Sequence, residues 1–335
     1  MSFKDIKGQD NSIHMLQGYL EQSRLEGGYL FTGPEGVGKK LVAKTLAKAV
    51  NCLKDGFDTS TSLSINGGRN RTIDSCDRCA PCIKIENSQH PDVHIVESGD
   101  SEIKIEYIRQ LQREINLKPY EARTKVFIID NAHRLTAEAE GALLKILEEP
   151  PAGSLIILIS DKPLLLFKTI VSRCKTLKFV PLERAALKEI LKENYSLDNN
   201  MSHFLAYFSE GRLGRALRLK DTDILKQKNK VIDNFALSKT TNLGNLSTQD
   251  KEEVRDYLNI LATWFRDIYL IKIGMPHSEV INFDRKDDLL KTAAGFTILD
   301  LNEVLDSISD SILRLEQNIN IKLLLYNLGA QIWRG

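Results

Sequence analysis

The chain has 335 residues, of which 42% are hydrophobic and 27% charged, and these proportions are typical of folded globular proteins. A chain of this length has room for two or three domains. The 46 lysines and arginines nearly cancel the 45 aspartates and glutamates, so bulk charge excludes a strongly basic nucleic-acid-binding protein; any DNA contact needs a local patch or a partner.

The first predicted motif is a phosphate-binding loop. Residues 28–32 are expected to form a short buried strand, and apolar residues recur at helical spacing over 41–50. Between them the pattern G-x-x-x-x-G-K-[ST] is matched in all but its last position, which gives the candidate nucleotide-binding residues Gly33, Pro34, Gly36, Val37, Gly38, Lys39 and Lys40. A strand, a glycine loop and a helix in this order predict a P-loop fold, in which the helix N-terminus receives an anion.

The last position of the loop argues against catalysis. A Ser or Thr hydroxyl there would bind Mg²⁺, whereas Lys40 carries an ammonium and no oxygen. We therefore expect weak binding of ATP or ADP, with no intrinsic ATPase activity in the isolated chain.

Three cysteines at two-residue spacing form a second motif. Cys76, Cys79 and Cys82 predict a tight loop around one tetrahedral ion, and Cys52, at the end of the P-loop helix, is the expected fourth ligand. Four thiolates indicate structural zinc that holds a loop-rich module over about residues 52–82. The polar segment 59–71 inside it is predicted to be a flexible excursion.

Alternatives to this metal site stay open. His90, Asp92 or His94 would replace Cys52 if that thiol pointed away. An iron–sulfur cluster is disfavoured because Cys82 is followed by Ile83 and not by proline. Reduced thiols without a metal are the remaining interpretation.

A second acidic anchor follows the apolar run 125–129. Asp130 ends this predicted central strand, and a carboxylate at the carboxyl edge of a parallel sheet can hold Mg²⁺. The next residue is Asn131, whose amide cannot act as a general base. The helix predicted over 137–149 is stopped by Pro150, and a third strand is predicted over 155–161 with polar residues at its end.

The pattern changes to helices near residue 180. We predict a P-loop domain over 1–179, a small helical lid over 180–240 and an all-α domain over 241–335, with a polar linker at 238–251. Apolar residues keep helical spacing over 254–268 and again over 301–319, which predicts a helical bundle. A bundle of this kind can be a self-contained core or an oligomerisation surface.

The segments GPEGVGKK, CDRCAPC, FIIDNAHRLT, GALLKILEEPP and SRC together resemble the bacterial clamp-loader branch of the AAA+ superfamily. The resemblance covers residues 28–215 and is closest to the delta-prime type of DNA polymerase III subunit, because gamma/tau-type subunits keep Ser or Thr after the loop lysine and Glu after the Asp. It implies a AAA+ P-loop domain with an inserted zinc module, followed by a helical lid and an all-α collar.

The resemblance also implies roles for two arginines. Arg173, in the Ser-Arg-Cys motif, is expected to act as an arginine finger on ATP bound to a neighbouring subunit, since a permanently charged guanidinium stabilises phosphoryl transfer. Arg215 is the expected sensor 2 residue, which would reach a nucleotide from the lid. The alternatives are an ordinary surface or salt-bridged arginine for Arg173 and a solvated helix charge for Arg215.

The functional expectation is a non-motor subunit of a clamp loader that places the sliding clamp on primer-template DNA. Its implied partners are gamma/tau-like ATPase subunits and a delta-like subunit, joined through the collar, while clamp and DNA are reached through the complex. The alternatives are an active gamma/tau-like ATPase subunit and a AAA+ regulator or remodeler outside replication. The polar segment 1–10 and the lack of a long apolar run predict a cytoplasmic chain, nucleoid-associated during replication, with no membrane partner.

Overall fold

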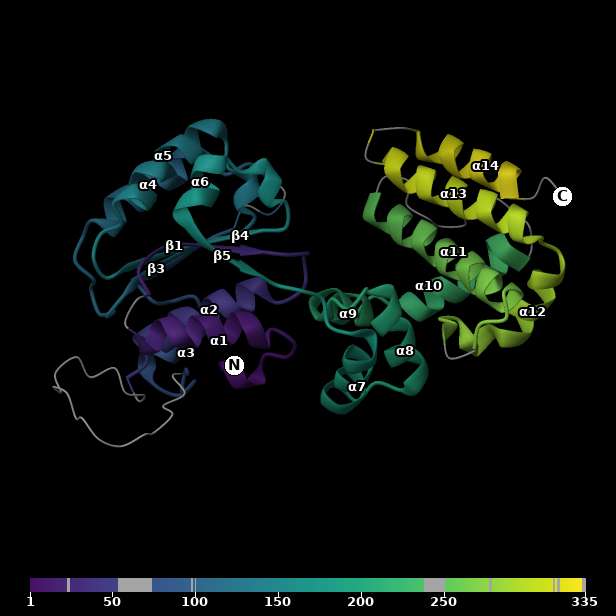
Figure 1. Cartoon of the computed structure of the whole chain (residues 1–335), viewed down its shortest axis with the longest axis horizontal. Coiled ribbons are helices and arrows are strands. Elements are labelled where there is room, and N and C mark those ends of the chain that lie inside the picture. The colour runs from purple at the N-terminus through teal and green to yellow at the C-terminus, as the bar shows by residue number, and fades with distance from the viewer. Residues whose placement is uncertain are drawn as a thin grey trace. The chain divides into compact units, whose positions relative to one another are not determined.

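The structure is a computed structural model that describes residues 1–22, 25–53, 74–97, 99, 101–237, 251–276, 279–315, 317 and 320–332. The chain divides into two compact units, Met1–Leu182 and Glu183–Gly335 (Figure 1). The predicted excursion at 59–71 lies outside the described residues. So does the predicted linker at 238–251, apart from its last residue, and the predicted boundary between lid and collar at residue 240 stays a prediction.

The first unit is built from alternating strands and helices. Its elements in chain order are η1 (Phe3–Asp5), α1 (Asp10–Glu21), β1 (Gly27–Thr32), α2 (Lys39–Asn51), α3 (Ala80–Glu86), β2 (Val93–Val96), α4 (Ile105–Ile115), β3 (Lys125–Ile129), η2 (Ala132–Arg134), α5 (Ala137–Glu148), β4 (Ser154–Ser160), η3 (Pro163–Leu165), α6 (Lys168–Arg173) and β5 (Cys174–Lys178). The strands form one parallel sheet in the order β2-β3-β4-β1-β5.

Both faces of this sheet are covered, as expected for parallel strands. Helices α1, α2 and α3 lie on one face and α4, α5 and α6 on the other (Figure 1). Strand β3 shows how the sequence divides between them, because Val126 and Ile128 join the core with α1 and α2 while Phe127 and Ile129 join the core with α4 and α5. This period of two explains why the central strands are continuous apolar runs.

A capping threonine and a proline set the two ends of helix α5. The Thr136 hydroxyl accepts a hydrogen bond from the N–H of Ala139 at its start. The helix stops at Glu148, two residues before Pro150, which cannot donate a backbone hydrogen bond.

The second unit is helical throughout the residues that the structure describes. Its elements are α7 (Arg184–Tyr195), α8 (Asn199–Phe208), α9 (Leu213–Lys220), α10 (Ile224–Val231), the π-helix η4 (Ile232–Leu237), α11 (Lys251–Lys272), η6 (Phe283–Arg285), α12 (Lys286–Ala294), α13 (Ile298–Leu315) and α14 (Ile321–Ile332). Helix α13 packs against both α11 and α14. The predicted fold class, an α/β sheet domain followed by helices, is confirmed.

The apolar stripes predicted for the bundle face its core. On α11, Leu258, Trp264 and Phe265 are fully buried, and on α13 Leu301 and Ile308 are. Ile319, the last residue of the second predicted stripe, lies outside the described residues. Among the described residues, no helix combines the length and the apolar character needed to cross a membrane.

Candidate functional site

The predicted phosphate loop connects β1 to α2 at the carboxyl edge of the sheet. Gly33 has a φ of 142°, and a Cβ at this position would lie 2.2 Å from the carbonyl oxygen of Phe179, so only glycine fits. Gly38 caps α2 with a φ of 97°. The carbonyl of Val37 accepts a hydrogen bond from the Gln9 amide, which ties the loop to the body of the first unit.

Lys39 is buried beneath this loop. Its ammonium donates hydrogen bonds to the carbonyl oxygens of Gly33 and Pro34, the second at 2.7 Å. Burial lowers the pKa of Lys39, while the nearby carboxylates of Asp161 and Asp130 act in the opposite direction. The Lys39 ammonium therefore lies where a P-loop binds phosphate.

Lys40, the residue after Lys39, occupies the position where the P-loop pattern has Ser or Thr. Its Nζ lies 3.2 Å from Oδ2 of Asp130 and 2.8 Å from Oε1 of Glu97. Asp130 follows β3 and Glu97 follows β2, so the two neighbouring strands bring both carboxylates to one edge of the sheet. Glu97 was not among the predicted site residues, because it reaches this edge through the pairing of the short strand β2 with β3, which no local sequence pattern shows.

Mg²⁺ does not fit this arrangement. The ion needs oxygen ligands at about 2.0–2.1 Å in octahedral geometry. Here the Asp130 carboxylate already pairs with an ammonium, and the residue that should supply a hydroxyl supplies that ammonium instead. A magnesium ion would have to displace Lys40 before reaching Asp130.

Ser160 and Asp161, at the end of β4, form a third polar group at this edge of the sheet, together with His133 of η2. The Nδ1 atom of His133 lies 3.1 Å from Oδ1 of Asp161 and 3.3 Å from the Ser160 hydroxyl. Burial lowers the pKa of His133, although the Asp161 carboxylate favours its protonated form. Asn131 adopts the left-handed conformation with a φ of 53°, and its N–H donates to the Asp130 carboxylate.

The four predicted zinc ligands come together. The Sγ atoms of Cys52, Cys76, Cys79 and Cys82 all lie within 4.8 Å of one another. Tetrahedral zinc with Zn–S bonds of about 2.3 Å places its sulfurs roughly 3.8 Å apart, and the separation of 4.0 Å between Cys52 and Cys79 is close to this value. The cluster fits zinc after a small contraction.

The thiols of the cluster differ in their electrostatics: burial and the neighbouring thiols raise the pKa of Cys82, whereas that of Cys76 is lowered. Burial alone would raise the pKa of Cys76, but the backbone N–H groups of Arg78 and Cys79 and the neighbouring thiols lower it to about 7. The N–H of Cys79 lies 3.4 Å from the Cys76 sulfur. Such donors stabilise the thiolate form that binds metal.

The alternative ligands are engaged elsewhere. His90 accepts a hydrogen bond from the N–H of Asp92 through Nδ1, and the Asp92 carboxylate accepts hydrogen bonds from three backbone N–H groups of the 120–122 turn. His94 stacks on Phe127 and lies 3.2 Å from Glu114. Each of these side chains has a structural role away from the thiols.

The cysteine cluster is joined to α2 by a buried lysine. Lys48 is 1% exposed, and its ammonium donates to the carboxylates of Asp77 and Glu86 at 2.7 and 2.6 Å and to the carbonyl of Met1. Asp77 lies in the loop between Cys76 and Cys79. The metal module and the P-loop helix therefore share one ion-pair network.

Arg173 is the last residue of α6 and lies partly exposed on the first unit. Its guanidinium donates to the carbonyl of Thr169 at 3.1 Å and pairs with Glu148 at 2.6 Å. The side chain is 35% exposed, so part of its charge faces solvent. Glu148 lies in the predicted LEEPP segment, but sequence reasoning gave it no role.

Arg215 lies in α9 of the second unit. Its guanidinium is 3.1 Å from Asp256 on α11, 3.8 Å from Glu210 and above the ring of Phe208. Only 16% of the side chain is exposed. The sensor role of Arg215 stays a prediction, because it requires release from Asp256.

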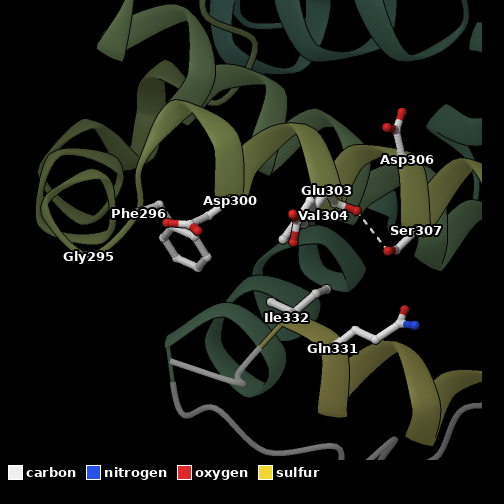
Figure 2. A pocket seen from close by; sticks show the side chains of 9 residues that line it. All are labelled: Gly295, Phe296, Asp300, Glu303, Val304, Asp306, Ser307, Gln331 and Ile332. Carbon is white, nitrogen blue, oxygen red and sulfur yellow. Dashed lines mark hydrogen bonds between the residues drawn. The ribbon is translucent and has the colours of Figure 1, made fainter.

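The second unit also contains a pocket of about 580 Å³ that the sequence did not indicate (Figure 2). It lies beside α13 and α14, and its lining includes Asp300, Glu303 and Asp306. None of the lining residues is basic, which argues against a phosphate or nucleic-acid site there.

The first unit thus has the sheet order, glycine loop and acidic strand ends of a P-loop nucleotide-binding fold, with an ammonium where a metal ion is expected. Residues 8–183 match the family model described as DNA polymerase III, delta subunit, and residues 222–332 match that of its C-terminal region. The chain belongs to this DNA polymerase III delta subunit family.

Two DNA polymerase III subunits of Bacillus subtilis agree with this assignment. The chain is 29% identical to DNA polymerase III subunit delta' of Bacillus subtilis over 100% of its own length and 99% of that protein. It is 31% identical to subunit tau of the same organism over 88% of this chain and 51% of tau. A gamma subunit-related protein of Thermotoga maritima, of known structure, is 18% identical over 96% of this chain and 99% of its own, with a TM-score of 0.44. The predicted resemblance to delta-prime subunits is confirmed.

Proposed function

We propose that this chain is a non-motor subunit of a DNA polymerase III clamp loader and supplies Arg173 to the ATP site of a neighbouring subunit. The observation that carries the proposal is a contrast within the first unit. Its own P-loop has Lys40 paired with Asp130, whereas Arg173 lies partly exposed at the end of a helix. The chain would thereby support ATP-driven loading of the clamp without cleaving ATP itself.

The position of Arg173 suits such a role. Helix α6 ends at this residue, and the guanidinium is held by one backbone carbonyl and one surface carboxylate. A surface ion pair of this kind contributes little energy, about 0–1 kcal/mol, so it can orient the guanidinium without holding it away from a phosphate chain on a partner. Arginine fingers contribute roughly 10³-fold or more to phosphoryl transfer in systems that use them.

Assembly is assigned to the second unit. Its helices α11, α13 and α14 form a bundle, and exposed apolar side chains, among them Leu299, Leu313 and Tyr326, lie on α13 and α14. We assign the contacts with gamma/tau-like and delta-like subunits to this collar. Sliding clamp and primer-template DNA are then reached through the assembled complex.

Two ligands complete the proposal. Zinc bound by the four thiols is structural, because a site with four protein ligands has no open position for a substrate. The P-loop retains Lys39 and the start of α2, so it binds ATP or ADP weakly and does not hydrolyse it.

The test is reconstitution of the loader with candidate partner subunits. Arg173→Ala is expected to leave assembly intact and to lower DNA-stimulated ATP hydrolysis by about 10³-fold at the neighbouring site. Arg109→Ala, which removes an exposed arginine of α4, is the matched control and should leave the rate unchanged. An unchanged rate in Arg173→Ala would remove the finger assignment.

The same preparation tests the alternatives. ATP turnover by the purified chain alone, abolished by Lys39→Ala, would identify an active gamma/tau-like ATPase. Failure to assemble with any clamp-loader subunit would favour a AAA+ regulator or remodeler outside replication.

A further inference from the structure

The P-loop of this chain contains an internal cation. Lys40 Nζ lies between the carboxylates of Asp130 and Glu97, at 3.2 and 2.8 Å, so one ammonium joins the ends of β2 and β3. The Lys40 side chain is 41% exposed, and it reaches inward to these two oxygens.

The charge on this ammonium is secure at neutral pH. Burial acts to lower the pKa of Lys40, but hydrogen bonds and charge from Glu97 and Asp130 outweigh it and raise the pKa above its usual value. The charge of Asp130, the acid expected to hold a metal ion, is thus partly offset from within the chain.

A single ammonium is not equivalent to Mg²⁺. It carries one positive charge, and its contacts of about 3 Å are hydrogen bonds, whereas the metal carries two charges and binds oxygen at about 2.1 Å. The two cannot share Asp130, since Lys40 and the metal ion would repel each other at that separation.

We propose that the P-loop of this chain binds the phosphates of a nucleoside phosphate without a divalent cation, and that Lys40 takes the place of the metal ion. The inference rests on the proposed retention of nucleotide binding in this loop. Phosphate charge is then balanced by Lys39 and the N-terminal end of α2, while Lys40 offsets the carboxylates of Asp130 and Glu97 beside them.

The arrangement explains why a lysine is tolerated at this point. Without it, Asp130, Glu97 and Asp161 would place carboxylates around a phosphate site that has Lys39 as its nearest cation. Lys40 offsets part of that charge and leaves the loop able to accept an anion.

The experiment measures ADP binding to the purified full-length chain by calorimetry, once with excess Mg²⁺ and once with EDTA. The expected dissociation constants differ by less than about threefold, or Mg²⁺ weakens binding because the metal complex of ADP must dissociate first. Tightening by Mg²⁺ of about tenfold or more would overturn the inference while leaving nucleotide binding intact.

A pair of matched variants tests the role of Lys40 itself. Lys40→Thr restores a hydroxyl and frees Asp130, so Mg²⁺ should then tighten ADP binding by about tenfold. Lys44→Thr makes the same change one turn further along α2, where the lysine donates to the Glu86 carbonyl, and should behave like the wild type.

Two other results would count against the inference. A Lys40→Thr variant that stays indifferent to Mg²⁺ would show that Lys40 is not what excludes the metal. No ADP binding by the wild type in either buffer would overturn both this inference and nucleotide retention, whereas the clamp-loader role is tested separately by the Arg173 assay.

Discussion

The guanidinium of Arg173 lies 2.6 Å from a carboxylate oxygen of Glu148, at the point where α6 ends beside the last residue of α5. Both side chains are substantially exposed, so the pair adds little to stability. Its effect is on geometry, since Glu148 restricts the directions in which a long, flexible arginine can point. The prolines after α5 hold Glu148 in this place by ending the helix there.

We expect Glu148→Ala to lower DNA-stimulated ATP hydrolysis by the reconstituted loader by about threefold to tenfold, less than Arg173→Ala does. The physical reason is that an unrestrained guanidinium spends less time in the productive direction. In the Arg173→Ala background the same change should have no further effect, because the two residues act together. Glu149→Ala, at the neighbouring exposed position, is the control; equal losses in both glutamate variants would contradict the positioning role.

Zinc content tests the cysteine cluster directly. Elemental analysis should find about one zinc per chain, lost in Cys79→Ser and retained in Cys174→Ser. Cys174 lies at the start of β5, outside the cluster, and burial raises the pKa of its thiol to about 12, so it offers no thiolate. Chelation of the metal should lower the Tm of the wild type and leave that of Cys79→Ser unchanged. Loss of zinc in Cys174→Ser would point to a different ligand set.

The central part of the fold could be predicted because its sequence signals are local. Strands β1, β3 and β4 are continuous apolar runs that are buried on both faces, and the spacing of the cysteines already places three thiols together. Helix α5 has a capping threonine and a proline stop. These signals need no knowledge of the rest of the chain.

The residues that sequence reasoning missed depend on long-range pairing. Strand β2 has only four residues, one of them His94, and it becomes a strand through its parallel partner β3. Glu97 therefore reaches the site through a pairing that a local pattern does not show. Helix α4 could have been found, since Ile108, Leu111 and Ile115 are buried at helical spacing.

The acid sensitivity of the first unit should depend on Asp92. Burial alone would raise the pKa of this carboxyl group, but hydrogen bonds from the N–H groups of Glu121, Tyr120 and Ala122 lower it below its usual value. A lowered pKa in the folded state stabilises the protein above the unfolded-state pKa of about 3.9, and this stabilisation is lost as pH falls through the folded-state pKa.

Asp92→Asn should therefore reduce the free energy of unfolding by about 1–3 kcal/mol near pH 7, and the difference from wild type should shrink below about pH 4. Urea unfolding followed by circular dichroism across this range measures it. Asp10→Asn, at an exposed position of α1, should change the free energy by no more than about 0.5 kcal/mol. A difference for Asp92→Asn that grows in acid would refute the assignment.

Variants of Asn131 test whether backbone conformation or the absence of a general base explains why asparagine follows Asp130. With a φ of 53° and a ψ of 45°, this position is left-handed, a conformation that asparagine and glycine adopt more readily than other residues. Asn131→Glu should thus destabilise the first unit by about 1–2 kcal/mol, whereas Asn131→Gly should stay within about 0.5 kcal/mol of wild type. Urea unfolding measures both. Asn131→Glu should also leave the purified chain without ATP turnover, because Lys40 still pairs with Asp130, and Mg²⁺-dependent nucleotide binding should appear only in variants that carry Lys40→Thr. If Asn131→Glu proved as stable as the wild type, backbone strain would play no part in the choice of asparagine, and the absence of a general base would be its remaining explanation.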